Sequence, residues 1–284
     1  MTKKYTLTLS CKDAMGIVAA VSGFLAEHKC FIIESAQTGD ASTGRFFMRT
    51  VFEARNSVSS AQEFNLLFEN IATRFSMDWE ISDNDVKPRL LIMVSKQGHC
   101  LNDLLHRYSS GSLKVEIPLV ISNHPDMGKM AKFYDIPFYH IPVSGNNRDE
   151  QEAKVLDMIK EHKIDLTVLA RYMQVLTPNI VDKIYGQAIN IHHSFLPGFK
   201  GAKPYHQAYD RGVKIIGATA HYVSNDLDEG PIIEQEVTRV NHSNIPEQLL
   251  SIGQDIESIV LSRAVKYHTE RRVILNGNKT VVFR

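Results

Sequence analysis

Hydrophobic and polar positions divide the chain into two segments with different patterns. In the first, up to about residue 83, strand-like and helix-like stretches follow one another in the order βαββαβ. This order is typical of a compact ferredoxin-like unit, with its helices on one face of an antiparallel sheet. We expect Asp13 to cap the first helix. The expected strands are residues 5–10, 31–37, 45–52 and 79–82, and the expected helices are residues 16–28 and 61–75.

The second segment begins with a continuous apolar run, Leu90 to Ser95, of the kind expected for a strand covered on both faces. Strands and helices then alternate at short spacing, which predicts a parallel, doubly wound sheet. A terminal hairpin is expected to turn at Asn276-Gly277. The further strands are expected at residues 115–122, 138–143, 165–170, 188–194, 215–224 and 231–240, and the helices at residues 100–108, 128–134, 149–162 and 246–272.

A polar stretch that contains Pro88 separates the two segments and is expected to be a linker. We therefore predict an N-terminal domain at residues 1–83, a linker at residues 84–89 and a second domain at residues 90–284. The predicted fold class is α/β: a ferredoxin-like βαββαβ domain, followed by a Rossmann-like, mostly parallel, doubly wound domain.

Composition and charge narrow the function classes. The chain has 284 residues, 43% hydrophobic and 23% charged, so it can build a core without disulfides or metals. Lysine plus arginine and aspartate plus glutamate both total 32, and this balance disfavours a nucleic-acid partner. The three cysteines are widely spaced, which argues for a reducing compartment and against a disulfide framework or a zinc site. Without a signal peptide or a membrane-spanning apolar run, we expect a cytoplasmic protein with no membrane partner.

The strongest local signal is the sequence NIHHSFLPG, Asn190 to Gly198. If residues 188–191 form a strand, Asn190 and His192 project from the same face, because side chains alternate with a period of two. They lie near the carboxyl end of that strand, where open α/β sheets bind ligands. An amide and an imidazole can stabilise a carbonyl oxygen that becomes negative in a tetrahedral intermediate. The pair therefore indicates acyl chemistry.

Neighbouring residues leave alternatives open. His193 is expected to point to the opposite face and to be structural. A metal held by two histidines is a competing interpretation, but no third ligand stands at metal spacing. Ser194 is a candidate nucleophile that lacks the G-x-S-x-G elbow. The turn Gly98-His99 offers backbone N–H groups to an anion, and it is equally typical of an ordinary βα turn.

A second signal is the acidic loop from Ser224 to Pro231, which follows the strand that contains His221. Acidic turns are commonly solvated surface, because Asp and Asn favour turns through local hydrogen bonds. Calcium is a further alternative, although the positions do not follow the EF-hand series. An aspartate that meets Asn190 and His192 would set the charge of the imidazole or accept a proton from water. That arrangement fits acyl transfer or hydrolysis without a covalent nucleophile.

These motifs together resemble a known family. The segment from Asn190 to Ile233 is similar to the core of the 10-formyltetrahydrofolate-dependent formyltransferases, through N-x-H, a following S-[FL]-L-P segment and a downstream H-[FY]-V-x-x-x-x-D-x-G-x-I loop. The similarity extends back to Leu90 and covers about two thirds of the chain. It implies the catalytic residues Asn190, His192 and Asp228. It also implies folate contacts at Met173, Val175, Ser224, Asn225 and Leu227.

The resemblance also distinguishes members of that family. A phosphate-bearing acceptor such as glycinamide ribonucleotide is bound at a Gly-Ser-Asn turn, and residues 96–102 lack the Ser-Asn pair. Members that act on tRNA carry a C-terminal β-barrel for which this chain is too short. Members that use water as acceptor, the formyltetrahydrofolate deformylases, carry an N-terminal ACT domain, which residues 3–83 resemble. The implied reaction releases formate and tetrahydrofolate for one-carbon and purine metabolism. Transfer of the formyl group to an amine acceptor is the alternative.

An ACT domain implies a regulatory amino acid, glycine or methionine first among the candidates, bound where two such domains pair. The resemblance therefore predicts a homo-oligomer. It implies no cofactor beyond the 10-formyltetrahydrofolate substrate and no metal. An oligomerisation module without a ligand is the alternative for this domain. The implied effector residues are Asp13, Met15, Gly16, Ile17 and Val18, in a turn whose backbone N–H groups can hold a carboxylate.

Overall fold

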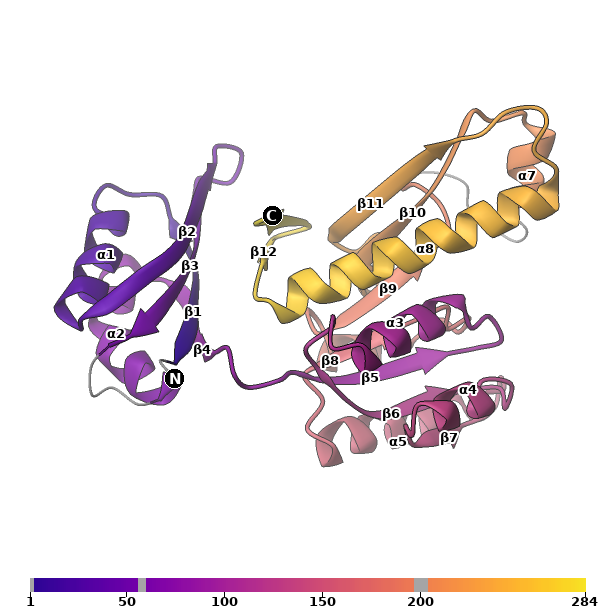
Figure 1. The fold of residues 1–284 in the computed structure, drawn as a ribbon, viewed down its shortest axis with the longest axis horizontal. Coiled ribbons are helices and arrows are strands. Elements are labelled where there is room, and N and C mark those ends of the chain that lie inside the picture. The colour runs from indigo at the N-terminus through magenta and orange to yellow at the C-terminus, as the bar shows by residue number, and fades with distance from the viewer. Residues whose placement is uncertain (1–2, 56–59, 197–203) are drawn as a thin grey trace. The chain divides into compact units, whose positions relative to one another are not determined.

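The computed structural model describes residues 3–55, 60–196 and 204–284, and it divides into two compact units (Figure 1). The first unit contains residues up to 87 together with residues 270–276 and 280–284. The second contains residues 88–269 and 277–279. The predicted second domain ran to residue 284, so the assignment of the C-terminal residues differs from that prediction. No helix in the described ranges is long and apolar enough to cross a membrane.

The first unit has the predicted βαββαβ order and a four-stranded antiparallel sheet, β2-β3-β1-β4. The helices α1 and α2 cover one face of this sheet (Figure 1), and the aromatic rings of Phe24, Phe52, Phe64 and Phe68 are buried between the two layers. The elements are β1 (Lys4–Lys12), α1 (Ile17–Glu27), β2 (Cys30–Asp40), β3 (Arg45–Ala54), α2 (Ala61–Phe75) and β4 (Asp78–Asp83).

The start of α1 differs from the prediction. Asp13 does not cap this helix, because the cap position is Gly16, three residues later. Gly16 has a φ of +92°, a left-handed conformation that costs glycine little because it lacks a Cβ atom. No side chain caps the first turn of α1.

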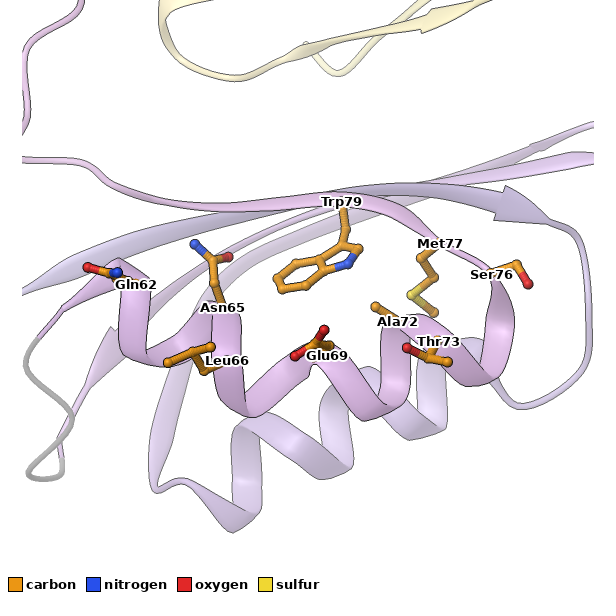
Figure 2. A pocket seen from close by; sticks show the side chains of 9 residues that line it. All are labelled: Gln62, Asn65, Leu66, Glu69, Ala72, Thr73, Ser76, Met77 and Trp79. Atoms are coloured by element: carbon orange, nitrogen blue, oxygen red, sulfur yellow. The ribbon is translucent and has the colours of Figure 1, made fainter.

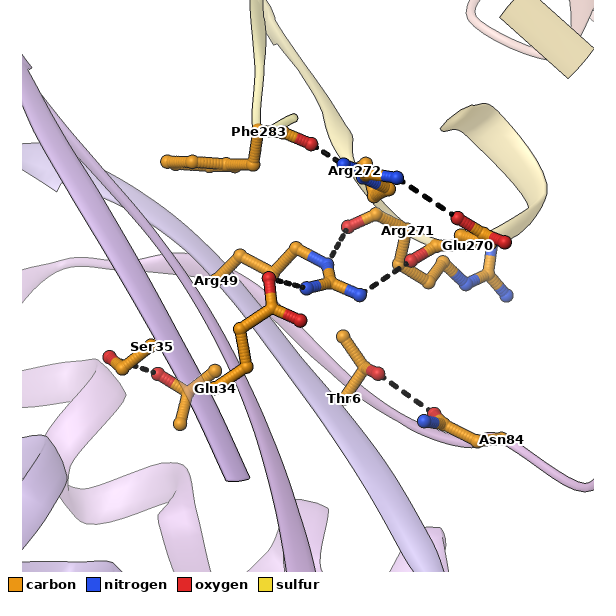
Figure 3. Close-up of polar contacts among 10 residues, drawn as sticks. Thr6, Glu34, Ser35, Arg49, Asn84, Glu270, Arg271, Arg272 and Phe283 are labelled. Atoms are coloured by element: carbon orange, nitrogen blue, oxygen red, sulfur yellow. Dashed lines mark hydrogen bonds and ion pairs between the residues drawn. The ribbon is translucent and has the colours of Figure 1, made fainter. Parts of the chain in front are cut away.

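One buried arginine helps to hold the C-terminal residues on the first unit (Figure 3). Arg49 of β3 donates from Nε to the carbonyl of Arg271 at 3.0 Å and from Nη2 to the carbonyl of Glu270 at 3.1 Å. Its Nη1 pairs with Glu34 of β2 at 2.9 Å. The predicted hairpin of β12 (Val273–Asn276) and β13 (Lys279–Val282) follows, with its turn at Gly277-Asn278, one residue later than expected. The guanidinium therefore ties β2, β3 and the tail together.

The second unit contains a seven-stranded sheet in the order β11-β10-β9-β8-β5-β6-β7. Strands β5 to β9 are parallel, while β10 and β11 are antiparallel, which confirms the mostly parallel α/β fold. The strands are β5 (Arg89–Val94), β6 (Glu116–Ser122), β7 (Phe138–His140), β8 (Leu166–Leu169), β9 (Ala188–His192), β10 (Ile215–Tyr222) and β11 (Ile232–Arg239).

Helices cover this sheet, and the longest one lies along β9, β10 and β11 (Figure 1). Two short helices, α6 and α7, were not predicted from the sequence. The helices are α3 (His99–Ser109), α4 (Gly128–Phe133), α5 (Arg148–Glu161), α6 (Pro178–Lys183), α7 (Pro204–Asp210) and α8 (Pro246–Thr269). Since β5 has β8 on one side and β6 on the other, the chain reverses its winding direction between β5 and β8. Such switch points are where doubly wound sheets bind ligands.

Replacing Arg49 tests how the tail is held. Arg49→Met removes three hydrogen bonds and leaves two carbonyls to find other partners, so we expect a loss of about 1–3 kcal/mol in the stability of the first unit. Urea unfolding measures that loss, and amide hydrogen exchange in residues 270–276 should accelerate. The control is Arg55→Met, whose side chain is 54% exposed, with an expected change within about 0.5 kcal/mol. Equal effects of the two changes would contradict the proposed anchor.

Candidate active site

One cavity in the second unit contains all the residues expected to act on the substrate. It has a volume of about 290 Å³, at the lower end of the roughly 300–1,000 Å³ typical of small-molecule sites. Asn190, His192 and Asp228 lie in its wall. The five expected folate contacts also line it: Met173, Val175, Ser224, Asn225 and Leu227.

Strand β9 presents Asn190 and His192 on one face, as the alternation of side chains predicts. Asn190 is half-buried and His192 is only 6% exposed. The antiparallel neighbour β10 places His221 opposite Asn190 and Thr219 opposite His192. Both catalytic candidates therefore have a cross-strand partner that fixes their surroundings.

Thr219 anchors the chain as it leaves β9. Its hydroxyl donates to the carbonyl of Ser194 at 2.9 Å and accepts from the N–H of Leu196 at 3.1 Å. Ser194 is buried. The motif continues through Pro197 and Gly198, which lie outside the described residues.

Asp228 reaches the site because the loop after β10 turns back along β9. Val223 donates to the carbonyl of Ala188, at the start of β9, about 13 Å in strand length from His192. Five residues later, Asp228 Oδ1 lies 3.2 Å from His192 Nδ1. Asp228 has a φ of +59°, which non-glycine residues adopt mainly at constrained positions. The backbone of the loop is thus strained at Asp228, and it holds the carboxylate against the imidazole of His192.

Two histidines keep Asp228 ionised. Burial alone would raise the pKa of its carboxyl group, but the hydrogen bond from His192 and the favourable interactions with both imidazoles hold that pKa far below the ordinary value. His221 Nε2 lies 3.8 Å from Asp228 Oδ1. The carboxylate is therefore an anion throughout the neutral and mildly acidic range.

His221 is a site residue that sequence analysis quoted but did not assign. Its Nδ1 lies 2.9 Å from the carbonyl of Tyr222, an acceptor, so Nδ1 carries a proton. Its Nε2 lies 3.3 Å from the Nδ2 of Asn190. The side chain is 3% exposed. His221 thus connects two catalytic candidates, and its cross-strand position opposite Asn190 is the signal that could have identified it.

In His192, Nδ1 has a partner and Nε2 has none among the described residues. Nδ1 faces the Asp228 carboxylate, an acceptor, and so carries a proton. Nε2 is buried without a hydrogen-bond partner among the described residues. Buried polar atoms are rarely left unpaired except where a ligand, water or ion completes them. The free nitrogen therefore points to a substrate atom as its partner.

His193 does not behave as the sequence predicted. Strand β9 ends at His192, so the alternation stops there and His193 also lies in the cavity wall. Its ring stacks on that of His192, with centroids 4.7 Å apart and planes at 26°. Its Nδ1 lies 2.9 Å from Nη1 of Arg171. The expectation that it points to the opposite face was wrong.

A buried charged cluster, Arg171, Glu257, His99 and Tyr205, continues from His193. Arg171 Nε lies 3.0 Å from Gln97 Oε1 and 3.4 Å from Glu257 Oε2. Glu257, 1% exposed, accepts from His99 at 2.7 Å and from the Tyr205 hydroxyl at 2.8 Å. Sequence analysis missed this cluster, although an acidic residue on the buried face of α8 was a visible signal.

Part of this cluster has metal-ligand spacing. The ligand atoms of His99, Cys100 and Glu257 lie within 4.8 Å of one another. However, the Arg171 guanidinium is 3.4 Å from Glu257 and opposes a second cation there. Burial also raises the pKa of the Cys100 thiol, which favours its neutral form over the thiolate that binds metals. These residues suit an internal ion-pair network better than a metal.

The expected folate contacts fall into two groups. Met173, Val175 and Leu227 line the cavity and are 58%, 52% and 61% exposed, so their apolar side chains are available to contact a ring. Ser224 and Asn225 are engaged in holding the loop instead: the Ser224 hydroxyl donates to the carbonyl of Asp226, and Asn225 Nδ2 donates to Asp182, both at 2.8 Å.

The backbone of the loop that contains Met173 is also partly occupied by a hydrogen bond within the protein. The N–H of Met173, expected to contact the pterin, donates to the Ser95 hydroxyl at 2.9 Å. Any folate contact at Met173 must therefore use its side chain or its carbonyl.

Of the expected effector residues, Asp13, Met15 and Gly16 precede α1 in the first unit, and Ile17 and Val18 begin that helix. Met15 is 99% exposed, whereas Ile17 is 1% exposed and belongs to the core. A separate hollow of about 540 Å³ lies over α2 and β4 (Figure 2). None of the expected effector residues lines it; Asn65, Glu69 and Trp79 are among those that do.

Comparison with known proteins places the chain in a family. Residues 88–265 match the formyl transferase family model. A formyltetrahydrofolate deformylase from Corynebacterium sp. (strain P-1) is 48% identical over 281 residues, 99% of this chain and 98% of the relative. One from Bacillus subtilis (strain 168) is also 48% identical, over 99% of this chain and 94% of the relative.

Comparison with solved structures gives the same family. The formyltetrahydrofolate deformylase of Burkholderia mallei superimposes with a TM-score of 0.95 at 52% identity, covering 99% of this chain and 100% of that chain. Phosphoribosylglycinamide formyltransferase from Anaplasma phagocytophilum is more distant, with a TM-score of 0.64, 31% identity, and coverage of 70% of this chain and 96% of that chain. The chain therefore belongs to the formyltetrahydrofolate deformylases, within the formyl transferase family.

Proposed function

We propose that this chain hydrolyses 10-formyltetrahydrofolate to tetrahydrofolate and formate, which supply one-carbon and purine metabolism. One observation carries the proposal: Asn190, His192 and Asp228 meet in a single cavity, with the Nε2 atom of His192 unpaired among the described residues. The full-length relatives that carry the deformylase name support water as the acceptor.

The formyl oxygen is held by two donors. The Asn190 amide has two N–H groups; one approaches His221, and the other can donate to the formyl oxygen. When His192 is protonated, Nδ1–H is held by Asp228 and Nε2–H donates to the same oxygen. Donors fixed in place before reaction stabilise the oxyanion more than water does, because they need no reorganisation.

The attacking water is held at Asp228. As the water oxygen bonds to the formyl carbon, it becomes acidic, and its proton passes to the carboxylate. A carboxylate with a lowered pKa is a weak base, so its larger contribution is to orient the water and stabilise the His192 imidazolium. The carbon–N10 bond then breaks, N10 takes up the proton that Asp228 received from the water, and formate leaves. Each role falls to a side chain, and the steps require no cofactor besides the folate substrate and no metal.

We also infer that the first unit pairs with a second copy. Strand β2 lies at the edge of the sheet, and it exposes 52% of Phe31, 36% of Ile32 and 45% of Ile33. An edge strand with exposed apolar side chains is a template for pairing with another strand. Antiparallel pairing of two β2 strands gives a homo-oligomer. Glycine or methionine, bound at the turn from Asp13 to Val18, is the proposed effector.

The role of Asn190 is tested by its removal. Asn190→Ala should lower the rate of formate release from 10-formyltetrahydrofolate by about 100- to 1,000-fold, because one oxyanion donor is lost, with folate affinity largely kept. The assay contains no amine acceptor, so formate from the unmodified protein also separates hydrolysis from transfer. Asn102→Ala, at an exposed position of α3, is the control. A fully active Asn190→Ala enzyme would refute the assignment, and formyl release only with an amine acceptor would favour a transferase.

Asp228→Asn should lower kcat/KM by about 100- to 10,000-fold, because the group that orients and accepts from water is lost. Since the pKa of Asp228 is held far below its ordinary value, the carboxylate stays ionised from pH 5 to 8. Protonation of Asp228 should therefore cause no loss of kcat/KM in the unmodified enzyme between pH 8 and 5. A loss between pH 6 and 5 that is absent from Asp228→Asn would mean that Asp228 becomes protonated there.

Pairing through β2 predicts that Ile33→Lys lowers the mass seen by sedimentation, because a charge at an unpaired edge opposes strand addition. Calorimetry with glycine and methionine, on both proteins, then tests the effector: binding that requires the pair should be lost in Ile33→Lys. Ile215→Lys, an exposed position in the second unit, is the control. An unchanged mass would count against β2 pairing, and the absence of heat with the unmodified protein would leave an oligomerisation module without these ligands.

A further inference from the structure

The imidazoles of His192 and His193 lie side by side in the cavity wall, and in each ring Nδ1 has a charged partner. His192 Nδ1 faces the carboxylate of Asp228 at 3.2 Å, whereas His193 Nδ1 faces the guanidinium of Arg171 at 2.9 Å. The two rings are stacked, and the Nε2 atom of each is buried without a partner among residues 3–55, 60–196 and 204–284. One ring is therefore tied to an anion and the other to a cation.

The contact with Arg171 decides which nitrogen of His193 carries the proton. A guanidinium has only donors, so His193 Nδ1 must accept and cannot hold a hydrogen. The single proton of the neutral ring is then on Nε2. Arg171 is itself held by Gln97 at 3.0 Å and Glu257 at 3.4 Å, and it is 8% exposed. Its φ of +63° is a second constrained backbone position at this site.

Burial and the surrounding charges keep His193 neutral. Burial, the largest cause, acts with the positive charges of Arg171 and His192 to lower its pKa to about 4, and the negative charges of Glu257 and Asp228 oppose this shift only in part. Because its folded pKa is lowered, the ring stays unprotonated at every pH above about 5.

We propose that His193 is a fixed N–H donor for the attacking water, and that Arg171 is the positioning residue that sets its tautomer. This inference rests on the proposed hydrolysis. The Nε2–H of His193 donates to one lone pair of the water oxygen. Asp228 accepts one of the water's protons, and the second lone pair attacks the formyl carbon. No bond to His193 forms or breaks.

A donor at this position selects water over an amine. Water has two lone pairs, so its oxygen can accept a hydrogen bond and attack at the same time. A neutral amine has a single lone pair; when that pair accepts from Nε2–H it cannot attack, and when it attacks the donor is left unpaired. A buried donor without a partner costs free energy, which disfavours the amine in the transition state. The tautomer of His193 thereby determines the preference for water over an amine as the acceptor of the formyl group.

The tautomer is measured directly by ¹⁵N NMR of the unmodified full-length chain between pH 5 and 8. We expect one histidine, absent from the spectrum of His193→Phe, to show a protonated Nε2 and an unprotonated Nδ1 throughout. This measurement needs no turnover, so it decides the tautomer even if the proposed reaction fails. A proton on Nδ1, or titration of His193 near pH 6.5, would overturn the inference.

The role in hydrolysis is measured by competition between water and hydroxylamine for the formyl group. His193→Phe keeps a stacked ring but removes the donor, so formate release should fall about 10-fold or more, and the share of formylhydroxylamine should rise. His193→Gln, which can restore an N–H, should recover part of both. His106→Phe, at an exposed position of α3, should change neither. An unchanged partition in His193→Phe would remove His193 from the chemistry, whatever its effect on stability.

Arg171→Met tests the positioning role through the pH profile. Without the guanidinium, His193 should regain a pKa nearer its ordinary value, and its protonation beside His192 should make hydrolysis fall at higher pH than in the unmodified enzyme. In Arg171→Met/His193→Phe that shift should be absent, because no second imidazole remains. A shift that persists in the double variant would show that Arg171 acts through other groups.

Discussion

The contact between the Asp228 carboxylate and the His192 imidazole is the constraint on which the site depends. It exists only because the loop after β10 turns back along β9. Gly230 allows that turn: a Cβ atom there would lie 1.7 Å from the carbonyl of Tyr222, too close for any other residue. Once the carboxylate is in place, it determines which nitrogen of His192 is free, and His221 and Asn190 complete the same group of contacts.

A second carboxylate, Glu257, belongs to the network that holds His193. It lies on the buried face of α8, where an ionised carboxylate is costly unless it is paired and hydrogen-bonded. Burial would raise the pKa of Glu257, but hydrogen bonds from His99 and Tyr205 and the charge of Arg171 lower it. Breaking one member would leave the others uncompensated, so this cluster contributes rigidity more than net stability. Its consequence for the site is a guanidinium held beside His193.

Much of the fold and the central residues of the site could be predicted from the sequence, because both rest on local periodicity. Alternation along β9 placed Asn190 and His192 on one face, and it failed for His193 because the strand ends one residue earlier. The cap at Asp13 was wrong because a glycine at position 16 allows the helix to start later. Arg49, Arg171 and Glu257 act through partners 15 to more than 200 residues away, and no local pattern encodes such pairings.

The two imidazoles show how one residue type can perform two tasks within one cavity. Both rings line the cavity and stack on each other, and His192 is the more buried of the two. Their chemical surroundings differ most clearly in the partner of Nδ1: an anion favours a proton on the facing nitrogen and tolerates a cationic ring, whereas a cation forbids that proton and disfavours a second charge. When their surroundings give two equivalent groups different pKa values, those surroundings decide which group exchanges protons during the reaction. By that reasoning His192 is the ring whose charge can change, and His193 is the ring whose charge cannot.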